Sequence, residues 1–174
     1  MLVLGLAPAA HGGNRTGRAF TGNRSADWLV SALNRTGFAN RAGSEHRGDG
    51  LMLRGAWMTS AVRCAPPANK PTEDERATCA RHLLATLDAL ASVTVVLALG
   101  AFAWVAAHRA LRLPDPPRFG HGVEAPAPGG LTLLASYHPS PQNTATGRLT
   151  APMMDAALRR ARQLAEVADP VDGE

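Results

Sequence analysis

The run VTVVLAL, residues 93–99, is the feature that most constrains the fold. It is continuously apolar and rich in β-branched residues, which is typical of a strand buried on both faces. Strands of that kind belong to parallel sheets that are covered by helices on both sides. This segment therefore favours an α/β architecture.

Strand and helix patterns alternate along the rest of the chain. Thr72 and Glu75 have the spacing of a capping box, which marks the start of a helix. The patterns predict strands at residues 2–4, 51–62 and 131–137, and helices that begin at Ser25 and Thr72, span 101–113, and run from a cap at Thr150 to about residue 165. We expect residues 114–130, which are rich in Pro and Gly, to form an irregular crossover or hairpin. The predicted fold is α/β, a three-layer α/β/α sandwich, in which ligands bind beyond the carboxyl ends of the strands.

Length and composition indicate one cytoplasmic domain. With 174 residues and 45% hydrophobic content, the chain is long enough to bury one core, which we expect to span residues 1–166 with a flexible tail at 167–174. Two cysteines exclude a secreted disulfide framework, and no apolar stretch is long enough to cross a bilayer. We therefore expect a cytoplasmic monomer with no membrane partner.

The charge favours an anionic partner. The formal net charge is +4, and Lys70 is the only lysine, so the positive charge is almost entirely guanidinium. Guanidinium groups bind phosphate oxygens in pairs. An arginine-rich composition is also typical of a GC-rich genome, and the charge alone leaves both explanations open.

A glycine-rich loop follows the first predicted strand, and residues 5–22 contain no Asp or Glu. Phe20 in this loop could belong to the core or could stack on a nucleobase. His138 begins a loop at the end of the last predicted strand, where a titratable donor is favoured for chemistry. The other histidines considered, at positions 46, 82, 108 and 121, lack that placement, and His82 and His108 are interpreted as surface or packing residues within helices.

Three motifs read together resemble one family. GLAP, AHGGNRTGR and HPSPQNTATGRLT, with residues 2 to about 164 around them, resemble the uracil-DNA glycosylase superfamily and most closely its family 5, the B type. The resemblance implies a four-stranded parallel sheet between helices. It also implies a monofunctional enzyme of DNA repair, which flips a base from double-stranded DNA and hydrolyses its N-glycosidic bond to leave an abasic site. The implied substrates are uracil and other deaminated bases, hypoxanthine and xanthine.

The same resemblance assigns roles to the pocket. Ala7 stands where other branches of the superfamily have a water-activating Asp or Asn, and Phe20 matches the aromatic residue that stacks on the flipped base. His138 matches the histidine that donates to the carbonyl oxygen of the departing base. Ser60 stands where the uracil-selective family 4 has an Asn, which argues against strict selection of uracil.

Glycosidic cleavage is dissociative, so stabilising the base anion removes the need for a carboxylate. We predict that His138 and backbone N–H groups of residues 7–10 hold that anion, and that Asn14, with His11 as second choice, positions the water. Asp27 falls in the first turn of a predicted helix, where a capping or dipole role is favoured over catalysis. The arginines predicted to contact DNA phosphates are Arg15, Arg18, Arg63 and Arg148.

Cys64 and Cys79 are either two unrelated thiols or half of an iron-sulfur or zinc site. The resemblance implies a [4Fe–4S] cluster with these two cysteines as ligands, and the family's N-terminal cysteine pair is absent from this sequence. A start codon assigned too late would explain that absence, and loss of the cluster is the alternative. Two rival functions follow: a damaged-DNA binding module without turnover, and a uracil-specific enzyme like family 4, which Leu6 and Ala7 disfavour.

Overall fold

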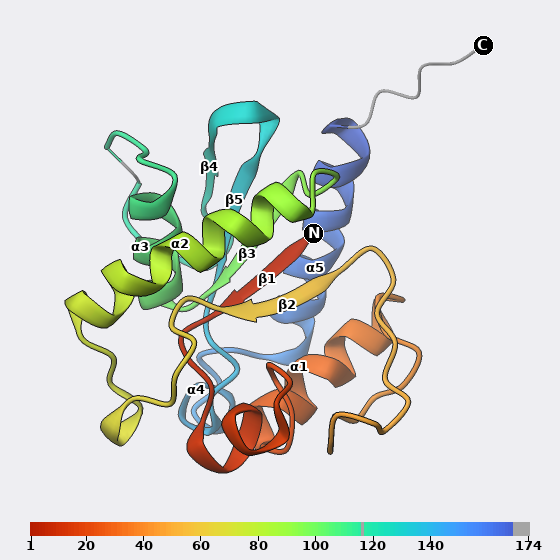
Figure 1. Ribbon diagram of the computed structural model, residues 1–174. Helices are drawn as coiled ribbons and strands as arrows, with labels where there is room; N and C mark the ends of the chain where they lie inside the picture. The colour runs from red at the N-terminus through yellow and green to blue at the C-terminus, as the bar shows by residue number, and fades with distance from the viewer. Residues whose placement is uncertain (116, 169–174) are drawn as a thin grey trace.

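A five-stranded sheet forms the centre of the protein. The computed structural model describes residues 1–115 and 117–168. Its strands are β1 (Leu2–Gly5), β2 (Trp57–Ser60), β3 (Val95–Leu99), β4 (Glu124–Pro126) and β5 (Thr132–Ser136), in the order β2-β1-β3-β5-β4 (Figure 1). β2, β1, β3 and β5 are parallel, whereas β4 pairs antiparallel with β5.

The expected four-stranded sheet is therefore wrong in its strand count, although its parallel part is confirmed. The missing strand is β4, which has three residues and lies at the edge of the sheet. It falls within residues 114–130, which are rich in Pro and Gly and show no alternation of apolar and polar residues that would indicate a strand. A strand of this length is fixed by its partner β5 rather than by its own sequence.

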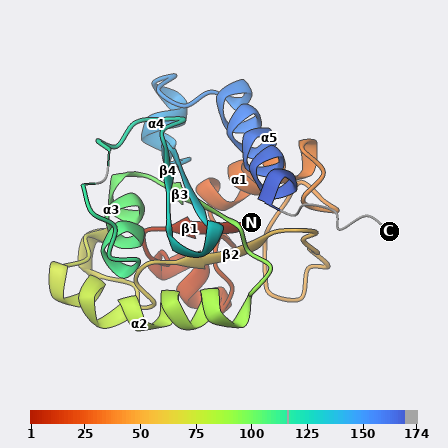
Figure 2. The same cartoon turned by 90° about the horizontal axis from the view of Figure 1, so that it is seen from above.

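Helices cover both faces of the sheet (Figure 2). α1 (Arg24–Arg35) and α5 (Ala151–Ala168) lie on one face, and α2 (Glu73–Ala89) and α3 (Ala101–Ala110) lie on the other. Successive residues of β1 point to opposite faces. Leu2 and Leu4 pack in the cluster beneath α2 and α3, and Val3 packs in the cluster beneath α1 and α5. The prediction of helices on both faces of the sheet is confirmed.

Several boundaries differ from the predicted ones. The capping box of Thr72 and Glu75 is confirmed at the start of α2, while α1 begins one residue before Ser25, after the cap Asn23. The strand predicted over 51–62 shrinks to β2, because Met52 is 59% exposed and the preceding segment makes only an isolated bridge, Ala39 to Leu53.

The C-terminal half shows smaller differences. α3 ends at Ala110 instead of residue 113, and α5 continues to Ala168, so the first two residues of the expected tail are helical. The rest of that tail, residues 169–174, lies outside the described residues. Within the described part of the chain, no helix combines the length and the apolar character that a bilayer crossing needs.

Candidate active site

A small cavity lies at the carboxyl ends of β1, β2 and β5, the part of the predicted fold where ligands were expected to bind. Its volume is about 20 Å³. It is lined by Leu6, Ala7, Pro8, Ala9, Gly13, Phe20, Ser60 and His138. Phe20 and His138, which are far apart in the sequence, thus share one cavity. Among the residues that line it, only Ser60 and His138 carry polar side chains, and none carries a carboxylate.

The Phe20 ring packs on the backbone at the end of β1. A Cβ placed on Gly5 would lie 2.5 Å from Phe20 Cζ, so only glycine leaves room for the ring here. Phe20 itself has a φ of 52°, a left-handed conformation that is rare for a bulky residue. Its carbonyl accepts a hydrogen bond of 2.7 Å from Ser44 Oγ, which holds the turn.

Arg18 holds this loop to the segment that follows α1. Its guanidinium donates to both carboxylate oxygens of Asp49 at 2.9 and 2.7 Å, and it also donates to Thr21 and Ser44. The Asp49 side chain is only 1% exposed. The hydrogen bond from Arg18 holds the pKa of Asp49 well below its usual range. Arg18, predicted to contact DNA, is therefore committed to a buried ion pair.

His138 is held from its backbone, in the loop between β5 and α4 (Pro141–Ala145). Asn143 Nδ2 donates to the His138 carbonyl at 2.9 Å, and Ser140 caps α4 by accepting from the Asn143 amide. Burial lowers the pKa of His138 to about 4, because a charged imidazole loses its hydration there. The ring is therefore neutral at pH 7.

Asn14 and His11 lie outside the small cavity. Asn14 is exposed and lines a neighbouring groove of about 620 Å³, which shares Pro8, Gly13 and Ser60 with the cavity. His11 is exposed and lines neither of them. Of the two predicted water-positioning residues, only Asn14 borders a space that shares lining residues with the pocket.

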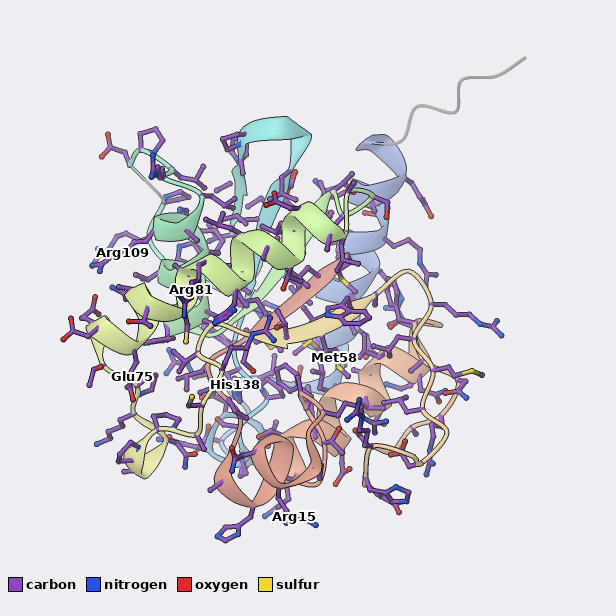
Figure 3. The ribbon with its side chains drawn as sticks, viewed as in Figure 1. Arg15, Met58, Glu75, Arg81, Arg109 and His138 are labelled. Atoms are coloured by element: carbon purple, nitrogen blue, oxygen red, sulfur yellow. The ribbon has the colours of Figure 1, made fainter. Side chains whose placement is uncertain are left out.

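The predicted DNA-contacting arginines other than Arg18 are exposed. Arg63 lines the large groove and donates to Thr86 on α2. Arg148 stacks on the Tyr137 ring at 4.8 Å and lines a third cavity of about 300 Å³, which shares Leu6 and His138 with the small one. Figure 3 shows Arg15 at the outer edge of the loop after β1, while His138 lies among the loops at the end of the sheet.

The two cysteines do not make a complete metal site. Cys64 is exposed, Cys79 is buried on α2, and both are free thiols. Among the described residues, no group of three or more His, Cys, Asp or Glu gathers around a common point. A [4Fe–4S] cluster is usually held by four cysteine ligands. The residues present therefore do not fit a whole cluster, although they include two thiols of the expected kind.

One histidine that the sequence set aside lies beside this site. His121 Nδ1 is 3.3 Å from Ser136 Oγ and 3.3 Å from the backbone nitrogen of Tyr137, the residue before His138. The only signal in the sequence is its position between two glycines, Gly120 and Gly122, ahead of β4.

Comparison with known proteins identifies the family and several relatives of this chain. The sequence profile of the Uracil DNA glycosylase superfamily matches residues 1–162. A type-5 uracil-DNA glycosylase of Mycobacterium bovis is 49% identical over 171 residues, which cover 96% of this chain and 63% of that relative. The type-5 enzyme of Thermus thermophilus is 50% identical over 95% of this chain and 75% of its own length. The Pyrobaculum aerophilum enzyme is 48% identical, over 92% and 70% respectively.

The match thus spans nearly all of this chain but less than two thirds of the Mycobacterium bovis relative. The profile covers the three loops that line the small cavity, since Leu6, Ser60 and His138 all lie within it. The chain belongs to the Uracil DNA glycosylase superfamily.

Proposed function

We propose that this protein removes uracil from DNA by hydrolysing its N-glycosidic bond, which leaves an abasic site. One observation carries the proposal: a stacking ring, Phe20, and a neutral histidine, His138, line the same cavity at the strand ends. This pairing suits a flipped nucleobase, which needs a surface to stack on and a donor for its carbonyl oxygen. The type-5 enzymes named above support the choice of uracil.

The chemistry is directed at the departing base. The bond between the sugar C1′ and the base nitrogen breaks, and its electron pair moves onto the base. Water then adds to C1′ and releases a proton to solvent, and the departed base anion takes up a proton from solvent. A neutral His138 ring has one N–H, which donates to the base carbonyl oxygen as negative charge develops there. Burial strengthens that interaction, because little water screens it.

The water is proposed to be positioned from the side of the large groove. No carboxylate lines the small cavity among the described residues, so a strong general base is not part of this proposal. Asn14 borders the groove that shares Pro8 and Gly13 with the cavity, and it takes the role of orienting the water. His11 is the second choice. Deprotonation of the water comes late, after most of the bond to the base is lost.

The pocket is proposed to accept hypoxanthine and xanthine as well as uracil. Ser60 and Ala7 give the base edge one hydroxyl and one methyl group. A hydroxyl both donates and accepts, so it discriminates poorly between bases that differ in where they carry carbonyl groups. A side-chain amide has a fixed donor and acceptor and would select more strictly.

The pocket must open to receive any of these bases. A volume of about 20 Å³ holds about one water molecule, which is far less than a pyrimidine ring. We therefore propose that base binding displaces the Phe20 ring or residues 6–9. Double-stranded DNA is the proposed partner, with Arg15, Arg63 and Arg148 contacting phosphates, and the protein is proposed to act as a monomer.

Cys64 and Cys79 are the proposed ligands if a [4Fe–4S] cluster forms. Two further ligands would be needed, and no cluster-forming set exists among the described residues. No step of the reaction is assigned to such a cluster.

Excision assays test the proposed function. The purified protein is incubated with duplexes that contain one uracil or one hypoxanthine, and alkaline cleavage reports abasic sites. We expect abasic product from the uracil duplex and a slower reaction with hypoxanthine. Binding to the damaged duplex without abasic product would overturn the proposed enzyme in favour of a binding module. Product from uracil alone would favour a uracil-specific enzyme.

A further inference from the structure

His121 is held against the end of β5 by the strand that follows it. Gly122 donates to the Ala135 carbonyl at 2.8 Å, and Ala135 donates to the Val123 carbonyl at 2.8 Å. These bonds continue the antiparallel pairing of β4 and β5 beyond β4 itself. The loop that carries His121 is therefore fixed relative to the residues that lead into the active-site loop.

The His121 imidazole accepts a hydrogen bond from the first backbone amide beyond the end of β5. β5 ends at Ser136, whose carbonyl still receives a hydrogen bond of 2.8 Å from Gly100. The next amide, that of Tyr137, donates to His121 Nδ1 at 3.3 Å. Because Nδ1 acts as an acceptor there, a neutral ring must carry its proton on Nε2.

The protonation state agrees with that assignment. Burial lowers the pKa of His121, and a backbone hydrogen bond with Met153, in the first turn of α5, opposes the shift without reversing it. The ring is thus neutral at pH 7, with Nδ1 free to accept. The two rings of His121 and Tyr137 also lie close, with centroids 5.4 Å apart.

The backbone around His138 is consequently held at two points. The Tyr137 amide is bound by His121 on one side, and the His138 carbonyl is bound by Asn143 on the other. The Tyr137 side chain is further enclosed by Phe119, at 6.0 Å between ring centroids, and by Arg148. The peptide group directly before His138 is bound as well, because Ser136 Oγ donates to the Tyr137 carbonyl at 3.1 Å. The His121 contact lies one peptide group earlier, at the Tyr137 amide.

We propose that His121 is a positioning residue for His138: by accepting the Tyr137 amide, it fixes the direction in which the His138 ring donates. This inference rests on the proposed function, because it assumes that His138 donates to the departing base. His121 does not line the small cavity. Its loss acts through geometry, and a misplacement of about 1 Å in a reacting group lowers rates about 100-fold.

Three variants test the role. His121→Leu replaces the imidazole by an apolar side chain and so removes the acceptor, and His121→Asn restores an acceptor oxygen near the position of Nδ1. Val123→Ala is the matched control, because it loosens the packing of the same loop without touching the Tyr137 amide. We expect His121→Leu to lower the single-turnover excision rate about 10-fold to 100-fold, with binding to an abasic duplex changed less than about twofold. His121→Asn should recover most of the rate.

Amide hydrogen exchange provides a readout that does not need activity. The Tyr137 amide should exchange slowly in the wild-type protein and in His121→Asn, and quickly in His121→Leu. If the wild-type protein excises no base, the proposed function fails, and the exchange pattern still decides whether His121 holds this amide. Fast exchange of Tyr137 in the wild-type protein would overturn the inference. So would a rate loss in His121→Leu that is no larger than in Val123→Ala, or one that His121→Asn does not repair.

Discussion

Two of the three loops that line the small cavity bring different chemistry to it. The loop after β1 contributes Leu6, Ala7, Pro8 and Ala9, none of which titrates. The loop after β5 contributes His138, whose pKa is lowered to about 4 by burial. The wall formed by residues 6–9 is thus apolar, and the only titratable side chain among the lining residues belongs to the other loop.

Under the proposed function, the difference indicates where the barrier to glycosidic cleavage is lowered. An apolar wall cannot take a proton from water, whereas a buried neutral imidazole can stabilise negative charge on the departing base. The two loops are also held in different ways. The first depends on the buried ion pair of Arg18 and Asp49. The second depends on uncharged hydrogen bonds, one that His121 accepts from the Tyr137 amide and one that Asn143 donates to the His138 carbonyl.

The largest effect on the excision rate is expected at His138, in the loop after β5. His138→Ala should lower the single-turnover excision rate about 100-fold to 1000-fold, as for removal of one donor to a developing anion. Binding to an uncleaved duplex should change far less. Asp27→Asn is the matched comparison, because Asp27 lies in the first turn of α1 and is an exposed carboxylate near the first loop in sequence. A comparable loss in Asp27→Asn would mean that a carboxylate contributes after all.

The apolar loop is expected to matter through shape. Gly5→Ala places a methyl group 2.5 Å from Phe20 Cζ and must displace the ring, since Gly5 is buried in β1 between β2 and β3. We expect about a 30-fold loss of excision from the misplaced stacking surface. Gly48→Ala is the control, because a methyl group there would meet only His46 Nδ1, at the ordinary contact distance of 3.9 Å. An unchanged rate in Gly5→Ala would exclude Phe20 from base binding.

The ion pair of Arg18 and Asp49, which holds the loop after β1, should affect stability more than the excision rate. Arg18→Met leaves the Asp49 carboxylate buried without its partner, which costs about 3–5 kcal/mol of unfolding free energy. Excision at a temperature where the variant stays folded should fall by about tenfold or less. Urea unfolding measures the first quantity, with the exposed Arg15→Met as control. Equal stability of the two variants would contradict a structural role for Arg18.

Acid should destabilise the protein partly through His138. Its pKa is about 4 when folded and 6.5 in the reference state, so the unfolded chain takes up a proton that the folded chain refuses. This contribution is fully present above pH 6.5 and is lost between pH 6.5 and 4, up to about 3 kcal/mol at 1.36 kcal/mol per unit. Urea unfolding of the wild type and His138→Gln at pH 8, 6 and 5 measures it. The variant should lose less unfolding free energy between pH 8 and pH 5 than the wild type. The same dependence on pH in both proteins would contradict a His138 ring that stays neutral in the folded state.

The sequence was sufficient for the parts of the fold with strong local patterns. The run at 93–99 predicted a buried strand, and β3 occupies Val95–Leu99. The Thr72 capping box predicted the start of α2. β4 escaped prediction because its three residues derive their conformation from pairing with β5.

The sequence predicted several residues that line the cavity, but not the residues that hold the lining loops in place. Motif resemblance pointed to Phe20 and His138, which do share a cavity. Arg18 could not be separated from Arg15 by sequence, because its partner Asp49 is 31 residues away and only the fold brings them together. His121 was set aside for the same reason, since its contact with Tyr137 spans 16 residues. The closed volume of the pocket depends on side-chain packing, which no local pattern encodes.

The most direct test of the central claim compares two departing bases. Fluorine at position 5 withdraws electrons and stabilises the uracil anion, so 5-fluorouracil depends less on a donor from the protein. Single-turnover excision of uracil and of 5-fluorouracil is measured for the wild type and for His138→Ala. If His138 acts on the departing base, the variant should lose several-fold less rate with 5-fluorouracil than with uracil. Equal losses for the two bases would contradict leaving-group stabilisation and assign His138 to another step.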